Sequence, residues 1–68
     1  PSIGVTMKCG IFYVEDSDDR VLIYRENDNG EHVRFEAIQD GRMTQVVFAN
    51  DAIRRMIDVL TDMVEGKE

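Results

Sequence analysis

The sequence predicts an α+β domain, in which a four-stranded antiparallel meander is followed by one C-terminal amphipathic helix that packs on one face of the sheet (ββββα). Four apolar runs rich in β-branched and aromatic residues are each closed by turn residues. The last segment then changes from a strand period to a helix period. Sixty-eight residues can enclose one core, so 1–68 is predicted to be a single domain, with the sheet over 7–49 and the helix over 50–66. Residues 1–6 are either a cloning remnant or a lead-in to the first strand.

Turn residues divide the sheet into its strands. The first strand runs to about Glu15 and ends in the acidic loop 16–19, after which the second strand covers 20–26. Asn29-Gly30 and Asp40-Gly41 both favour type I′ hairpin turns, whose two central residues need φ > 0. They place the third strand at 31–39 and the fourth at 42–49.

One helical stripe runs through the last segment at the spacing i, i+3, i+4, i+7. Asn50 or Asp51 is a good N-cap, and Gly66 stands where a helix would end. The opposite side is charged and carries Arg54, Arg55, Asp58, Asp62 and Glu65. The apolar stripe consists of Ile53, Met56, Ile57, Leu60, Met63 and Val64.

The turns also predict a register. A two-residue turn at 40–41 pairs Gln39 with Arg42, and therefore Ala37 with Thr44, Phe35 with Val46 and Val33 with Phe48. A two-residue turn at 29–30 sets Tyr24 opposite Phe35 and Leu22 opposite Ala37. A four-residue loop after Glu15 puts Tyr13 beside Leu22 and Ile11 beside Tyr24, and Cys9 follows as an inert core thiol. These pairs form one mostly apolar face, which is expected to receive the helix.

The second face of this predicted sheet breaks the usual alternation of apolar and polar residues. An apolar cluster of this kind indicates a surface that binds a partner. A bulge at Gly10 is the alternative, because it would reverse Phe12 and Val14. The predicted partner-binding residues are Phe12, Ile23, Arg25, Arg34, Ile38, Met43 and Val47.

Arg25 and Arg34 come out opposite each other in the same register, and like charges that face each other across strands are destabilising. Either Glu26 and Glu36 neutralise the pair, or an anion such as a partner's carboxylate or a phosphate binds there. His32 lies toward the same end and is interpreted as a solvated side chain.

Composition limits the function classes. The net charge of −6 disfavours general binding to nucleic acid. The single cysteine excludes an intramolecular disulfide and a cysteine-based zinc site, and it suits a cytoplasmic protein. The acidic loop lacks the spacing of a calcium loop. A lone Pro1 does not make a tautomerase, since those enzymes have a β-α-β order. No catalytic, cofactor, metal or membrane-spanning pattern is present, so we expect no enzyme and no cofactor.

The predicted ββββα order resembles that of the single-stranded-DNA-binding transcriptional coactivators, whose members dimerise and bind DNA on the sheet side. The present chain offers only Arg25, Arg34 and Lys8 for such a surface. The stretch 48–56 (FANDAIRRM) is similar to small phage-type proteins, which often bind a host protein. We therefore expect a non-enzymatic, homodimeric protein that acts through protein–protein contact on the open sheet face. The alternative is a binder of single-stranded DNA or RNA that uses the arginine-bearing face.

Overall fold

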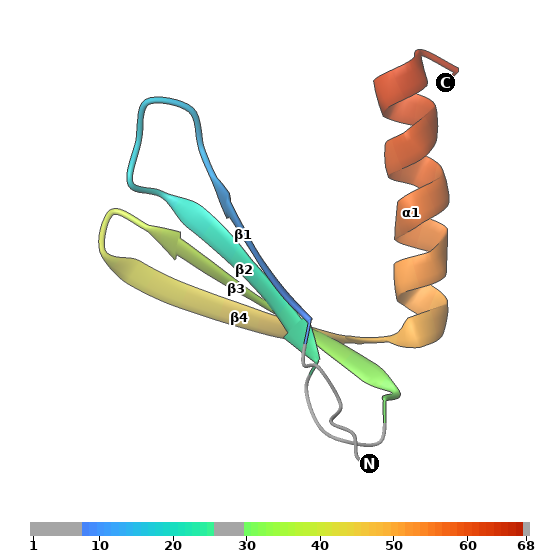
Figure 1. The fold of residues 1–68 in the computed structure, drawn as a ribbon, viewed down its shortest axis with the longest axis horizontal. Coiled ribbons are helices and arrows are strands. Elements are labelled where there is room, and N and C mark those ends of the chain that lie inside the picture. Colours follow the sequence, from blue (N-terminus) through green and yellow to red (C-terminus); the bar gives the residue numbers. More distant parts are fainter. Residues whose placement is uncertain (1–7, 26–29, 68) are drawn as a thin grey trace.

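The computed structural model describes residues 8–25 and 30–67, and its element order is the predicted ββββα (Figure 1). The first six residues, whose origin the sequence leaves open, lie outside this part of the chain. The four strands form one antiparallel sheet in the order β1-β2-β3-β4. The elements are β1 (Cys9–Tyr13), β2 (Arg20–Arg25), β3 (His32–Gln39), β4 (Arg42–Ala49) and α1 (Asn50–Glu65).

The hairpin of β3 and β4 has the predicted register. Gln39 pairs with Arg42, and the pairing continues to Val33 with Phe48. Both central residues of the turn have positive φ, 53° at Asp40 and 78° at Gly41. This is the backbone of a type I′ turn, whose twist matches that of the strands on either side.

The predicted register between β2 and β3 is wrong by one residue. Phe35 lies opposite Ile23 rather than Tyr24, and Ala37 lies opposite Val21 rather than Leu22. The pairing of Arg25 with Val33 leaves the odd number of residues 26–32 between them, so a two-residue turn cannot connect these strands. Gly30 has φ 77°, in the left-handed region that favours glycine. The remainder of this connection, 26–29, lies outside the described residues.

The register between β1 and β2 differs from the prediction by two residues, because the four-residue loop begins one residue early. Val14 donates its N–H to the carbonyl of Asp19 (2.9 Å), which leaves 15–18 as the loop. Ile11 therefore pairs with Leu22, and Tyr13 with Arg20. Pairing runs without interruption from Cys9 to Tyr13, so the alternative of a bulge at Gly10 is wrong.

These registers define two faces of the sheet, since residues directly opposite each other share a face. Because the observed register between β2 and β3 differs by one residue from the predicted one, the side chains of β1 and β2 lie on the opposite faces from those predicted. The first face, here called the Phe35 face, carries Phe12, Val21, Ile23, Arg25, Val33, Phe35, Ala37, Gln39, Arg42, Thr44, Val46 and Phe48. The second, here called the Tyr24 face, carries Cys9, Ile11, Tyr13, Arg20, Leu22, Tyr24, His32, Arg34, Glu36, Ile38, Met43, Gln45 and Val47.

Helix α1 ends as predicted and begins differently. Gly66 adopts φ 74°, and Lys67 donates its N–H to the Asp62 carbonyl (2.8 Å), as in a Schellman C-cap. The N-cap is Ala49, which has no side chain that could cap the helix, so the prediction of Asn50 or Asp51 as N-cap is wrong. The Asn50 side chain instead donates to the carbonyl of Gly30 (2.6 Å).

The helix does not cover the sheet of its own chain, contrary to the prediction. It follows β4 without a connecting residue and rises away from the sheet, approaching only β3 and β4 (Figure 1). The radius of gyration is 14.2 Å, whereas a compact domain of this length has about 11 Å. The single chain is therefore an open V rather than a closed two-layer domain.

An open V encloses no core. No described residue is buried, and the helix stripe is exposed over most of its length. Met63 is 55% exposed, and Cys9 is exposed on the Tyr24 face, so neither is the core residue that the sequence predicted. The chain exposes 5649 Å², about 1,300 Å² more than the ~4,400 Å² expected of a compact monomer of 7.8 kDa.

Candidate protein-binding surface

The Phe35 face is apolar across its centre. Phe35 and Phe48 form an edge-to-face ring pair with centroids 5.6 Å apart, a geometry that adds to the energy of area burial. Val46, opposite Phe35, is nevertheless 47% exposed. Its polar residues in the described strands are Arg25 at one end of the sheet and Gln39, Arg42 and Thr44 toward the other. This is the composition of a sheet face that normally packs against another layer.

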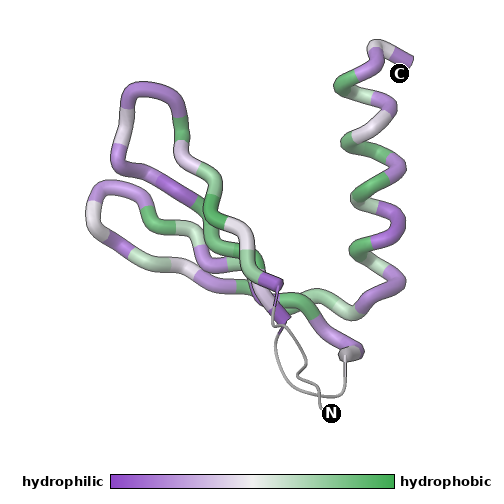
Figure 2. Tube along the Cα trace, in the orientation of Figure 1, coloured by the Kyte–Doolittle hydropathy of each residue, from purple (hydrophilic) through white to green (hydrophobic). Residues whose placement is uncertain are grey.

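The helix stripe is the second exposed apolar surface. Figure 2 shows apolar positions recurring on the side of α1 toward the sheet and polar positions on the opposite side. Near the start of the helix, Ile53 and Met56 are half-buried, as is Phe48 at the end of β4. Further along, Leu60 is 58% exposed and Val64 is 86% exposed. The exposure of the stripe therefore increases along the helix as the helix moves away from the sheet.

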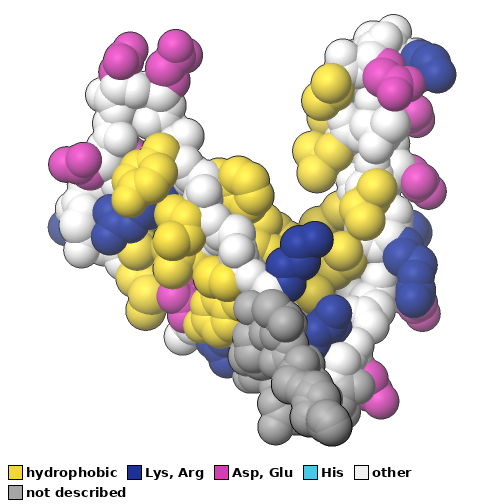
Figure 3. All heavy atoms as spheres, in the orientation of Figure 1, with side chains coloured by type: hydrophobic (Ala, Val, Ile, Leu, Met, Phe, Trp, Pro, Cys, Tyr) yellow, Lys and Arg dark blue, Asp and Glu magenta, His cyan; other side chains and the backbone are white. Residues whose placement is uncertain are grey.

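A hollow separates the sheet from the helix, and apolar side chains line both of its walls (Figure 3). The first turn of α1 closes the hollow at its narrow end, where Asn50 donates its N–H to the carbonyl of Glu31 (3.0 Å). At the other end the hollow is open. A monomer with two unpartnered apolar walls has the features of a protein-binding surface.

Three groups fix the direction in which the helix leaves the sheet. Arg25 donates to the carbonyl of Gly30 (2.8 Å) and to the side-chain oxygen of Asn50 (3.5 Å). Asn50 in turn donates to the same Gly30 carbonyl. These bonds tie the end of β2 and Gly30, which precedes β3, to the first helical residue. Arg25 therefore has a structural role at this junction.

The Tyr24 face is more polar than the Phe35 face. Tyr24 donates its hydroxyl hydrogen bond to Glu36, and Arg34 donates to Gln45. The guanidinium of Arg20 lies 6.0 Å from the centre of the Tyr13 ring, within reach of a cation–π contact. Such cross-strand pairs between polar side chains are typical of the solvent face of an antiparallel sheet.

The predicted partner-binding residues do not form one surface. Phe12, Ile23 and Arg25 lie on the Phe35 face, whereas the other members, Arg34, Ile38, Met43 and Val47, lie on the Tyr24 face. Arg25 pairs with Val33, and Arg34 pairs with Tyr24. The predicted face-to-face arginine pair is therefore wrong, and the anion site that was inferred from it loses its basis.

The residues that sequence reasoning missed are those it assigned to an intramolecular core. The sheet residues Phe35, Val46 and Phe48 were expected to be covered by the helix. The helix residues Leu60 and Val64 were expected to pack on them. The predicted bounds of the fourth strand and the helix already left no residue between them. That direct junction was the available signal, because a helix that folds back over its own sheet needs a connecting loop.

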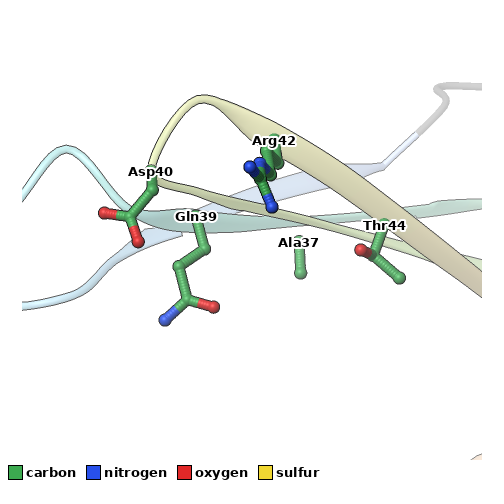
Figure 4. Close-up of a pocket in the computed structure, with 5 residues that line it drawn as sticks. All are labelled: Ala37, Gln39, Asp40, Arg42 and Thr44. Atoms are coloured by element: carbon green, nitrogen blue, oxygen red, sulfur yellow. The ribbon is translucent and has the colours of Figure 1, made fainter.

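The remaining hollows on the described surface are shallow. One of about 590 Å³ lies at the Asp40-Gly41 end of the Phe35 face and is lined by Ala37, Gln39, Asp40, Arg42 and Thr44, which follow one hairpin (Figure 4). Nothing in it pairs a nucleophile with a base. In the acidic loop 15–18, Ser17 accepts a backbone bond from Asp19 (2.9 Å). Within residues 8–25 and 30–67, no cluster of His, Cys, Asp or Glu could hold a metal ion.

Two further findings bear on the class of protein. Among the described residues, no helix has both the length and the apolar character needed to cross a bilayer. Comparisons with protein-family models, curated proteins and solved structures find no match. The case for a function therefore depends on the geometry of the chain itself.

Proposed function

We propose that this chain is a non-enzymatic binding protein that acts through protein–protein contact, and that its first partner is a second copy of itself. One observation carries the proposal: no described residue is buried, while the Phe35 face and the helix stripe are both apolar. A folded chain needs buried apolar area to offset the entropy of ordering its backbone. A single chain in this conformation lacks that area, so association supplies it.

The area available is of the right size. The excess over a compact monomer is about 1,300 Å², whereas a standard interface buries about 800 Å² on each partner. A two-fold dimer places the same surface of both chains in contact. The proposal therefore needs no partner of special chemistry to account for the exposed surface.

The neighbouring residues Val46 and Val47 allow a matched test. They have similar exposure, 47% and 41%, but Val46 lies on the Phe35 face and Val47 on the Tyr24 face. In sedimentation equilibrium, the wild type should dimerise. Val46→Asp should weaken dimerisation by about 100-fold or more, because it buries an unpaired charge, and Val47→Asp should change it little.

One outcome of this experiment would overturn the proposal, and a second would move the interface to the opposite face of the sheet. A wild type that stays monomeric at the highest accessible concentration would exclude self-association. A dimer that tolerates Val46→Asp but not Val47→Asp would place the interface on the Tyr24 face.

Binding to nucleic acid is the alternative, and its structural basis is weaker than the sequence suggested. Arg25 is engaged at the helix junction, and Arg34 lies on the other face. A nucleic-acid binder should lose affinity steeply between about 50 and 200 mM salt. We expect titration with single-stranded oligonucleotides to show no binding even at low salt. Tight, salt-dependent binding would support the alternative.

A further inference from the structure

We infer that the dimer forms by exchange of helices, so that α1 of each chain lies in the hollow of the other and packs its stripe on the partner's Phe35 face. The inference rests on the proposed self-association and specifies which surfaces meet. In one chain, the junction at Ala49 and Asn50 keeps the helix stripe away from the Phe35 face. A second copy supplies a helix stripe for the Phe35 face of the first chain, and a Phe35 face for its helix stripe.

The first argument is the length of the connection. β4 ends at Ala49 and α1 begins at Asn50, so no loop residue joins them. Reversal of a helix over its own sheet requires a connection of a few residues. The helix therefore cannot close on the Phe35 face of the same chain unless the end of β4 or the first turn of the helix unwinds.

The second argument is the hydrogen bonding at the junction. Unwinding the first helical turn would break the bond from the Asn50 N–H to the Glu31 carbonyl (3.0 Å). It would also break the bonds that join Arg25, Gly30 and Asn50. A half-buried arginine would then lose two acceptors at once. The junction therefore favours the open conformation that leaves the hollow accessible.

The third argument is the match between the two surfaces. A helix of sixteen residues is about 24 Å long, and a strand of eight residues is about 27 Å long. One helix thus spans the apolar length of the sheet. Its stripe carries Ile53, Met56, Ile57, Leu60, Met63 and Val64, which offers a continuous apolar ridge to the aromatic and β-branched residues of the Phe35 face.

The arrangement also closes by symmetry. If one chain inserts its helix into the hollow of the second, a two-fold axis inserts the second helix into the first. Both walls of both hollows are then covered. The Tyr24 faces point outward in this dimer, in agreement with their polar cross-strand pairs.

Complementation between two variants tests the exchange. Val46→Asp damages the sheet surface, and Leu60→Asp damages the helix surface. Each homodimer contains two damaged contacts, whereas the mixed dimer contains one intact contact, formed by the helix of the first variant and the sheet of the second. We expect sedimentation of the mixture to show association at least about tenfold tighter than either variant alone, together with a gain in circular dichroism if the separate variants are unfolded.

The other arrangements give different results. Closure of each helix on its own sheet predicts no gain on mixing. Pairing through helices alone predicts that Val46→Asp dimerises like the wild type. Either result would overturn the exchange and leave the proposed self-association standing, whereas a monomeric wild type would remove both.

A second measurement needs no variant. Wild-type chains with and without ¹³C are unfolded together, refolded and examined by isotope-filtered NOE spectroscopy, which detects contacts between chains only. The exchange predicts contacts from the rings of Phe35 and Phe48 to the methyl groups of Ile57 and Leu60. Contacts between chains that join helix to helix and never helix to sheet would contradict it.

Discussion

At the residue scale, Gly41 is a position where a substitution tests the effect of backbone conformation on stability separately from packing. Its φ is 78°, and no atom beyond its two chain neighbours lies within 4 Å of the place where a Cβ would stand. Substitution therefore meets no steric obstacle outside the residue itself. We expect Gly41→Val to lower the free energy of unfolding by at least about 1 kcal/mol, because β-branched residues avoid positive φ.

Gly41→Asn is the matched control for this prediction, since asparagine tolerates the left-handed region. It should cost less than half as much as valine in urea denaturation at one fixed protein concentration. Equal stability of all three proteins would mean that the 40–41 turn, and the register it sets, is not the one described.

At the residue scale, two dipeptides that both favour a two-residue turn lie in connections of different length. Asp40-Gly41 forms the two-residue turn that its sequence favours. Asn29-Gly30 lies in a connection of odd length, in which Gly30 also has positive φ. A dipeptide reports the need for positive φ but not the number of residues in the loop. One residue of difference was enough to move Ile23 from the predicted face to the other.

The helix shows at the scale of the element what periodicity can and cannot predict. Spacing alone gave the stripe and the Gly66 C-cap correctly. It could not say which surface the stripe meets, because an amphipathic helix presents the same pattern to its own sheet and to a partner. The same limit applies to the sheet, where alternation predicts a buried face without identifying what covers it.

Leu60 and Val59 provide an element-scale test of whether the stripe is covered. They are 58% and 51% exposed in the single chain and about 100° apart around the helix axis. If a partner covers the stripe, Leu60→Ala should destabilise the protein by about 2–5 kcal/mol. Val59→Ala, at the margin of the stripe, should cost clearly less.

Chemical denaturation of both variants at matched concentration gives the comparison. A loss within about 0.5 kcal/mol at Leu60 is the behaviour of a surface residue, and it would mean that the stripe stays in solvent. Similar large losses at both positions would indicate a covered surface that is wider than the stripe.

At the scale of the whole molecule, the sequence predicts the order of the elements but not their arrangement in space. The strand order, three of the six strand ends that face turns (Arg20, Gln39 and Arg42), and the helix all follow from local patterns. The open V does not, because it depends on the junction at Ala49 and Asn50 and on bonds from Arg25 that no local pattern reveals. The expectation of a partner came instead from the apolar cluster on the second face of the predicted sheet, and a chain of this size also buries little area alone.

The proposed self-association predicts that the stability of the whole molecule depends on its concentration. If the folded state is a dimer and the unfolded state is a monomer, each tenfold rise in chain concentration stabilises the dimer by ~1.4 kcal/mol. The urea midpoint of the wild type should therefore rise steadily over about a hundredfold range of concentration. Val46→Asp is the internal control, because a variant whose dimer is about 100-fold weaker should have a lower urea midpoint than the wild type at every concentration. A wild-type midpoint that does not move with concentration would show that one chain buries enough area to be stable by itself, which the exposed 5649 Å² argues against.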